Sequence, residues 1–173
     1  DALDGPPALR QAGFLTGRGQ HVQIHRYCSH PRGHGGNPRP GPELEAVSSS
    51  DSAVAAIDWS SIDINGNRRE VTFAMVSLEP GAVPFDYAVS TIDMDCSQLR
   101  YATLRSSFYD RRGTQVIDDF VGDGTWTPLS EGTIMGDVRR EVCASDSSRS
   151  GYFNTAQDFA VGAWRVVEQQ KSK

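Results

Sequence analysis

Short apolar runs separated by turn-forming residues occupy the chain from Ala53 onward. Because no helical segment separates these runs, the pattern favours hairpins and an antiparallel meander over parallel crossover units. The runs with the length and the β-branched and aromatic content of strands are Val54–Trp59, Glu70–Ser77, Phe85–Asp95, Tyr101–Tyr109 and Thr114–Val121. The turns between them are marked by Asn65-Gly66-Asn67, Pro80-Gly81 and Asp110–Gly113.

Side-chain alternation is clearest in the third run, because successive residues of a strand point to opposite faces. One face carries Ala88, Ile92, Met94 and Cys96, and the other carries Tyr87, Thr91, Asp93 and Asp95. We therefore expect Cys96 to point with the apolar set.

The period becomes helical after Trp126-Thr127-Pro128. The apolar stripe of this first helix is Ile134, Met135, Val138 and Val142. We expect Ser130 as its N-cap and Glu131 in its first turn. Gly132 and Gly136 each cost such a helix about 1 kcal/mol relative to alanine, so packing must hold it.

A second helix is predicted near the C-terminus, with Asn154 as N-cap and Gln157 three residues later. Its apolar stripe is Ala156, Phe159, Ala160, Ala163, Trp164 and Val167. We expect the stripe to dock on the sheet or on the first helix. The alternative is a partner-binding or membrane-surface helix, which Asp158 and Glu168 on the polar face, in place of a row of lysines, disfavour.

These patterns predict an α+β fold: an antiparallel sheet of about five to six strands, a disulfide-tethered helix and an additional C-terminal helix. We expect this domain to span residues 53–173, since 173 residues fit one core. Residues 1–52 are rich in Gly, Pro, Arg and His, and we expect a disordered or loosely ordered extension there.

The charge balance narrows the function classes. The net charge is −5, and the arginines are scattered, so no clustered basic face is predicted for nucleic acid. No apolar run is long enough for a membrane span. Because the chain begins with Asp1 and not with Met, we expect a processed or truncated form.

The distribution of histidine and lysine argues against several enzyme classes. All four histidines, His21, His25, His30 and His34, lie in the extension. A Ser-His-Asp or Cys-His site within the domain is thereby excluded unless the extension folds back onto it. Lysine occurs only at Lys171 and Lys173, which argues against a phosphate-loop or Schiff-base lysine.

Carboxylates are the remaining candidates for catalysis or metal binding. Asp93 and Asp95 project from one strand face and are candidates for a glycosidase-like acid/base pair. Asp118, Asp119 and Asp123 cluster in a later segment but lack the regular alternation of oxygen ligands of an EF-hand. We interpret all five as solvated acidic positions and expect no enzyme, cofactor or metal.

The three cysteines allow one disulfide and one leftover thiol, and their spacing alone does not fix the pairing. We favour Cys96 with Cys143, because the first ends an inward-facing strand and the second ends a helix that needs anchoring. The alternative is a reduced pair of small core residues. Cys28 has His25, His30 and His34 nearby, yet no folded frame around them, so we expect no metal site there.

A set of aromatic and arginine residues has the composition of a protein-binding surface. Its members are Tyr101, Arg105, Tyr109, Arg111, Arg112 and Trp126. The alternative interpretation is a half-buried sheet face on which arginines cover the rings.

Taken in order, several short motifs resemble the surface-adhesin protein E-like domain family of bacterial envelope proteins. They are Asp58-Trp59-Ser60-Ser61-Ile62, Gly66, Asp95-Cys96, Arg100, Phe108-Tyr109-Asp110 with Gly113, Trp126 with Pro128, and Cys143. The resemblance covers roughly residues 54–145. It implies a sheet of about six strands, a Cys96–Cys143 bridge, export, a tendency to dimerise, and adhesion to host extracellular proteins.

We therefore expect an exported, non-catalytic, adhesin-like module in the periplasm or on the outer-membrane surface of a Gram-negative bacterium. Its expected partner is a host extracellular or envelope protein, with a homodimer as a further expectation. A structural envelope protein without a soluble ligand is one alternative, and a carboxylate-dependent hydrolase is another.

Overall fold

The computed structural model of the chain describes residues 43–144 and 151–172. The predictions for residues 1–42, including Cys28 and the four histidines, lie outside the described residues.

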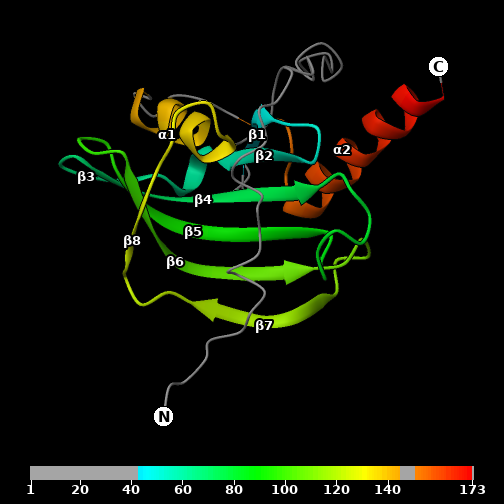
Figure 1. Cartoon of the computed structure of the whole chain (residues 1–173), viewed down its shortest axis with the longest axis horizontal. Helices are drawn as coiled ribbons and strands as arrows, with labels where there is room; N and C mark the ends of the chain where they lie inside the picture. The colour runs from blue at the N-terminus through cyan, green and yellow to red at the C-terminus, as the bar shows by residue number, and fades with distance from the viewer. Residues whose placement is uncertain (1–42, 145–150, 173) are drawn as a thin grey trace, which may run out of the picture.

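In the described part of the chain, one antiparallel sheet of eight strands forms the body of the fold (Figure 1). The strands are β1 (Leu44–Ser49), β2 (Ala53–Asp58), β3 (Asp63–Asn65), β4 (Arg68–Ser77), β5 (Tyr87–Asp95), β6 (Arg100–Tyr109), β7 (Gln115–Val121) and β8 (Trp126–Pro128). The main path runs β1-β2-β4-β5-β6-β7, while β3 pairs with β4 and β8 pairs with β6. A short 3-10 turn, η4 (Trp59–Ser61), follows β2.

The predicted α+β fold is confirmed, and the five predicted strands correspond to β2, β4, β5, β6 and β7 with ends shifted by at most two residues. The sequence pattern missed the short strands β3 and β8 and the edge strand β1. Three-residue strands carry too little alternation to be recognised, and their pairing depends on a neighbour already in place.

The expected start of the domain at residue 53 is corrected by β1. This strand pairs antiparallel with β2, and its first residue, Leu44, is 3% exposed. The indole N–H of Trp59 donates to the Glu45 carboxylate at 2.8 Å, which links β1 to η4. The serines that end β1 resemble a linker by composition, although the strand is part of the sheet.

Two helices pack on opposite faces of the sheet: α1 (Ile134–Ala144) and α2 (Ala156–Lys171). Ala53, Ala55 and Ile57 of β2 pack with α1, whereas Val54 and Ala56 pack with α2. Because successive side chains of β2 alternate between the faces, every residue of β2 is buried. The predicted docking of the second helix on the sheet is confirmed.

Both helices begin later than the sequence predicts. The side chain of Thr133, not of Ser130, caps α1 by accepting the Gly136 N–H at 3.1 Å, and the Thr155 side chain accepts the Asp158 N–H at the start of α2. Gly132 lies in the preceding turn with a φ of +75° and costs the helix nothing. The geometry of the turn before each helix determines which residue caps it, and a helical wheel does not represent that geometry.

Replacing Gly136 with alanine is expected to lower the free energy of unfolding by about 1–3 kcal/mol, although alanine has the higher helix propensity. A Cβ at this position would lie 2.5 Å from the Ser130 carbonyl oxygen. Urea unfolding of the variant measures the change. A more stable variant would show that the turn can move away at little cost.

The predicted disulfide between Cys96 and Cys143 is confirmed. It joins the end of β5 to the last turn of α1, with a Cα–Cα distance of 5.5 Å. Cys96 lies on the same face as Ile92 and Met94, as the alternation predicted, and these residues belong to the core beneath α1. The guanidinium of Arg139 also donates to the Cys96 carbonyl at 2.8 Å, so α1 is held to β5 twice.

Candidate binding surface on the open sheet face

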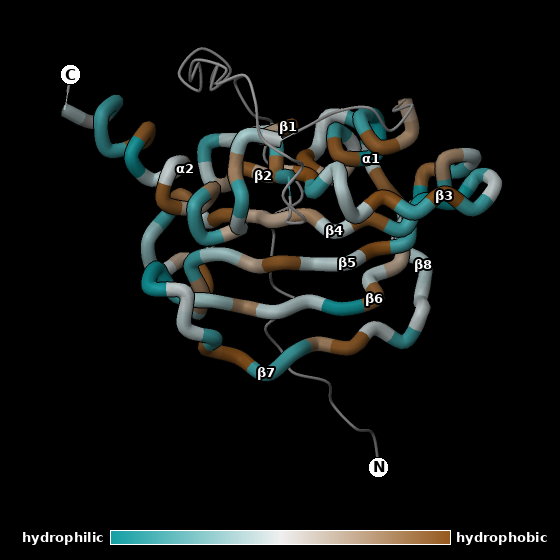
Figure 2. The backbone as a smooth tube through the Cα atoms, turned by 180° about the vertical axis from the view of Figure 1, so that it is seen from behind, coloured by the Kyte–Doolittle hydropathy of each residue, from teal (hydrophilic) through white to brown (hydrophobic). Residues whose placement is uncertain are grey.

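Neither helix of residues 43–144 and 151–172 lies over the part of the sheet farthest from β1 (Figure 1). Figures 1 and 2 show both helices near β1, β2 and β4, with β6 and β7 beyond them. On the α2 side, the ends of β4 and β5 together with β6 and β8 form a polar face that α2 does not reach. Of the six predicted binding residues, Arg105 and Trp126 lie on this open sheet face.

Two arginine–carboxylate pairs organise the open sheet face. Arg68 at the start of β4 forms a two-point ion pair with Asp93 of β5, and its Nε donates at 3.1 Å. Arg100 of β6 donates through Nε and Nη2 to one oxygen of Asp95 at 3.0 and 2.9 Å. The carboxylate side chains are 11% and 9% exposed, whereas those of the arginines are 57% and 38% exposed. The buried acids therefore hold two outward-facing guanidinium groups in place.

Trp126 of β8 completes this arrangement. The guanidinium carbon of Arg100 lies 4.6 Å from the Trp126 ring centroid, and that of Arg68 lies 5.2 Å from it. Both are cation–π distances, each contact contributing on the order of 0.5–1 kcal/mol at an exposed site. The pairing of Trp126 with the small Ala102 of β6 leaves room for the ring above the sheet. An indole and two guanidinium groups are thus fixed together at a partly exposed position.

The surroundings of Asp95 explain why it remains ionised. Its Oδ1 accepts hydrogen bonds from the Ser97 hydroxyl at 2.6 Å and from the Ser97 and Gln98 N–H groups. The Ser97 hydroxyl makes the largest contribution to lowering the pKa of Asp95, and Arg100 lowers it further against the opposing effect of burial. A general acid needs a raised pKa, so this carboxyl is poorly suited to the acid/base role considered from the sequence.

Asp95→Asn is expected to weaken the dependence of stability on acid pH. Because folding lowers this pKa, the ionised group stabilises the fold above its unfolded pKa of about 3.9, and that contribution is lost as pH falls through the folded pKa. Chemical denaturation at neutral pH and near pH 3 measures the difference. The wild type should lose more stability between the two conditions than the variant, and an equal loss would contradict the prediction. Asp51→Asn, in the exposed turn after β1, is the matched control.

Arg105 lies on the same open face, paired with Asp119 of β7. Asp119 also accepts from the Ser107 hydroxyl at 2.7 Å, and this bond, followed by Arg105, lowers its pKa. The hydrogen bond with Asp119 in turn raises the pKa of Arg105. The arginine is 64% exposed but already neutralised, so it offers a ligand less charge than the sequence indicates.

Tyr101 does not lie on the open sheet face. The β5–β6 register shifts between Thr91 and Ile92, leaving an extra residue in β6. This bulge places Tyr101 opposite Met94, against the core beneath α1, whereas Arg105 lies opposite Thr91. Burial raises the pKa of Tyr101, in agreement with this position.

Tyr109 and Arg111 pack against the core beneath α2 and do not lie on the open sheet face. Tyr109 stacks on Tyr87 with 5.0 Å between ring centroids. The guanidinium carbon of Arg111 lies 4.7 Å from the Trp164 ring of α2, and the group also pairs with Asp86 and Glu168. This is the alternative considered from the sequence, in which arginines cover aromatic rings.

The Asp110–Gly113 turn is likewise built around α2. The Asp110 carboxylate accepts the N–H groups of Arg112 and Thr114 at 2.9 and 2.8 Å. Gly113 has a φ of +81°, and a Cβ there would lie 2.7 Å from the Gln157 side chain. Arg112 is exposed at the tip of this turn. The motif thus has a structural role in docking the second helix.

Sequence reasoning missed Arg68 and Arg100 as members of the surface. The β5–β6 hairpin pairs Asp95 with Arg100, and β4 pairs Arg68 with Asp95. The turn residues between these strands were the available signal, since a hairpin register places such pairs on one face.

The interpretation of five aspartates as solvated is wrong for Asp93 and Asp95, which are buried beneath their arginines, whereas Asp118 is exposed. The remaining two have structural partners. Asp119 is ion-paired, and Asp123 accepts the Thr125 N–H at 2.9 Å. Hydrogen bonding from the Thr125 side chain, followed by that from its N–H, lowers the pKa of Asp123. Among residues 43–144 and 151–172 there is no group of His, Cys, Asp or Glu suited to a metal ion. Within the same ranges neither helix has the length and apolar character of a membrane span.

Residues 44–144 match the family described as surface-adhesin protein E, and this match covers more than half of the chain. The chain belongs to this family. The match confirms the resemblance predicted from the motifs and extends it to the start of β1. It ends at the last residue of α1, so α2 lies outside the matched region. No curated protein and no solved structure matches the chain. Membership in a surface-adhesin family indicates an exported protein with an adhesin-like role.

Proposed function

We propose that this protein is a non-catalytic, adhesin-like module that binds a host extracellular or envelope protein through the open sheet face around Trp126. The observation that carries the proposal is the position of Trp126 beside two outward guanidinium groups held by buried carboxylates. Tryptophan and arginine are enriched among the residues that dominate protein–protein binding energies. Groups fixed in advance also lose little conformational freedom on binding.

A carboxylate-dependent hydrolase is less well supported by the same residues. Asp93 and Asp95 are the carboxylates considered for that role, and each is committed to an arginine. Inverting and retaining glycosidases need one carboxyl that donates a proton, and Asp95, whose pKa is lowered, donates a proton poorly. We therefore place the function in protein binding on the cell envelope, on the periplasmic or the outer surface.

Trp126→Ala is expected to weaken binding by roughly 30-fold or more, corresponding to a central contact of about 2 kcal/mol. Surface-immobilised wild type is titrated with a panel of purified extracellular-matrix proteins and with envelope proteins of the producing cell. At least one should bind saturably, and the variant should bind it more weakly.

Tyr152→Ala is the matched control for the open sheet face, because Tyr152 is an aromatic residue 66% exposed beside the start of α2, at a separate groove. Equal loss in both variants would place binding away from Trp126. Lack of saturable binding to the whole panel would favour a structural envelope protein. Turnover of glycosides that disappears in an Asp93→Asn/Asp95→Asn variant would favour the hydrolase.

A further inference from the structure

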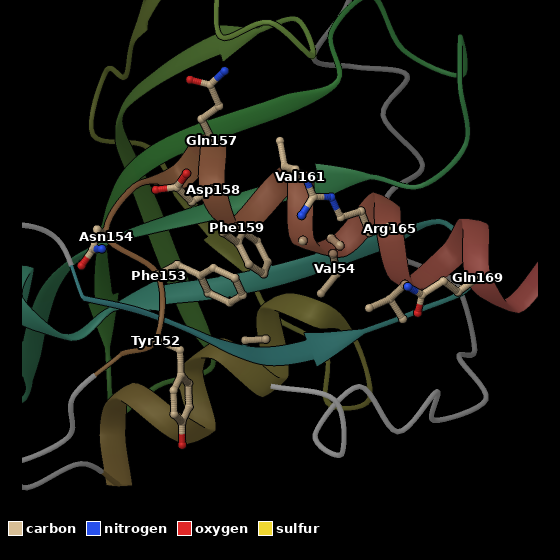
Figure 3. Close-up of a pocket in the computed structure, with 14 residues that line it drawn as sticks. Val54, Tyr152, Phe153, Asn154, Gln157, Asp158, Phe159, Val161, Arg165 and Gln169 are labelled. Atoms are coloured by element: carbon tan, nitrogen blue, oxygen red, sulfur yellow. The ribbon is translucent and has the colours of Figure 1, made fainter. Parts of the chain in front are cut away.

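A groove of about 930 Å³ lies between α2 and the edge strand β1 (Figure 3). Apolar side chains of β1, β2, α2 and the segment before α2 line it: Ala46, Val54, Phe153, Phe159, Ala163 and Val166. Arg165, Gln169 and Asp158 contribute polar groups from the helix. The groove is separate from the open sheet face around Trp126.

The end of the groove near the start of α2 is rigid. Phe153 and Phe159 meet edge to face with 5.5 Å between ring centroids, side by side in Figure 3. A Cβ on Gly162 would lie 3.1 Å from the Phe153 ring, so glycine lets this ring approach the helix closely. Val54, at 1% exposed, lies deep beneath α2. The shape of the groove is therefore set by packed side chains.

The free edge of β1 forms one border of the groove. Leu44 exchanges two backbone hydrogen bonds with Phe153, at 3.0 and 3.1 Å, on the side of β1 away from β2. In an antiparallel strand, alternate residues direct their N–H and C=O groups to the same side, so those of Ala46 point to this edge too. No strand of the described ranges pairs with β1 there. The backbone beside the groove can therefore accept an added strand.

Arg165 is the basic group of the groove, and Asp158 at the start of α2 is its acidic group. Asp158 accepts a hydrogen bond from the Thr155 hydroxyl at 2.8 Å, as part of the cap of α2. Arg165 is exposed and forms no ion pair with the carboxylates of the described residues. An acidic group on a ligand would complement it.

We propose that this groove binds an extended peptide segment of a partner protein. The segment adds to β1 as an antiparallel strand at Ala46, places an apolar side chain in the groove beside Val166, and places a carboxylate against Arg165. Backbone pairing supplies affinity in such strand additions, and the pocket for alternate side chains supplies specificity. Because α2 lies outside the family match, one wall of this site comes from a part of the chain beyond the family domain.

Selection of a displayed library of short random peptides on the full chain tests the proposal. Selected peptides should alternate apolar residues and carry an acidic residue. In two-dimensional NMR spectra, their binding should shift the amide signals of β1 and α2. Arg165→Glu should raise the dissociation constant about ten-fold. Gln170 is exposed on the same helix but lies outside the groove, so Gln170→Glu should change the dissociation constant little.

Peptides N-methylated at alternate positions lack the backbone N–H donors that strand pairing needs. They therefore distinguish strand addition from burial of apolar side chains alone, without altering the protein. Methylation in one register should abolish binding, and methylation in the other should leave it unchanged. Equal effects of both registers, amide shifts confined to other strands, or a selection that yields no binding peptide would overturn the proposal. Trp126→Ala should leave peptide binding intact, so failure here and failure of the proposed function are distinguishable.

Discussion

Replacing both Cys96 and Cys143 with alanine is expected to lower the free energy of unfolding by about 4 kcal/mol. The bridge closes a loop with a sequence separation of 47 residues. A loop of this length lowers the conformational entropy of the unfolded chain, which stabilises the folded state by about 4 kcal/mol. The variant also frees the C-terminal end of α1, a helix in which Val138 and Val142 are fully buried. Urea denaturation of the wild type and the variant measures the difference.

Two controls accompany this measurement. Adding a reductant to the wild type should lower its stability to near that of the double variant. Cys28→Ala should have little effect, because Cys28 is not part of the bridge. A double variant within about 1 kcal/mol of the wild type would mean that helix packing alone holds α1 on the sheet.

Trp164→Ala is expected to cost about 3–5 kcal/mol, the range for truncating a large buried aromatic side chain. The Trp164 side chain anchors α2: its indole N–H donates to the Ser77 carbonyl at 3.0 Å, and its ring meets that of Tyr87 at 6.4 Å. The residue is 7% exposed and lies beneath the Arg111 guanidinium. Thermal and urea unfolding measure the loss.

Tyr152→Ala provides the comparison for Trp164→Ala, and its stability should stay within about 0.5 kcal/mol of the wild type. Similar stability of Trp164→Ala and the wild type would show that α2 contributes little to folding. That result would also weaken the proposed groove, since α2 forms one of its walls.

Much of the fold was accessible from local patterns. The alternation in β5 correctly placed Cys96 on the same face as Ile92 and Met94, and the helical stripe ending near Cys143 indicated a partner for it. These features depend on the strand and helix periods, which any short stretch of sequence displays. The apolar stripe of α2 was also predicted correctly, since four of its residues lie in the core against the sheet.

The candidate site was only partly accessible, and β6 shows why. Tyr101, Arg105 and Tyr109 share the parity that would place them on one face of a regular strand. A bulge changes the parity within β6, so Tyr101 lies against α1. A register shift of this kind cannot be predicted from the local sequence. It arises only when two strands pair and one of them contains an extra residue.

The contacts that each arginine makes also depend on residues far away in the sequence. Arg111 is separated from Trp164 by most of the second half of the chain, yet the two side chains are in contact. Arg68 and Arg100 come from strands on either side of β5 and meet at Trp126 of β8. Composition indicated arginine and aromatic contacts, but it did not say which arginines face a ligand.

The sequence by itself determined the α+β class, five of the strands, both helices, the preferred cysteine pair and the family, because these follow from short-range periodicity and ordered motifs. The tertiary structure decided which surfaces remain available. It placed Arg111 and Tyr109 against α2, Tyr101 against the core beneath α1, and Trp126 beside two guanidinium groups. Strand register and helix docking create those neighbours across long sequence separations, where periodicity carries no information.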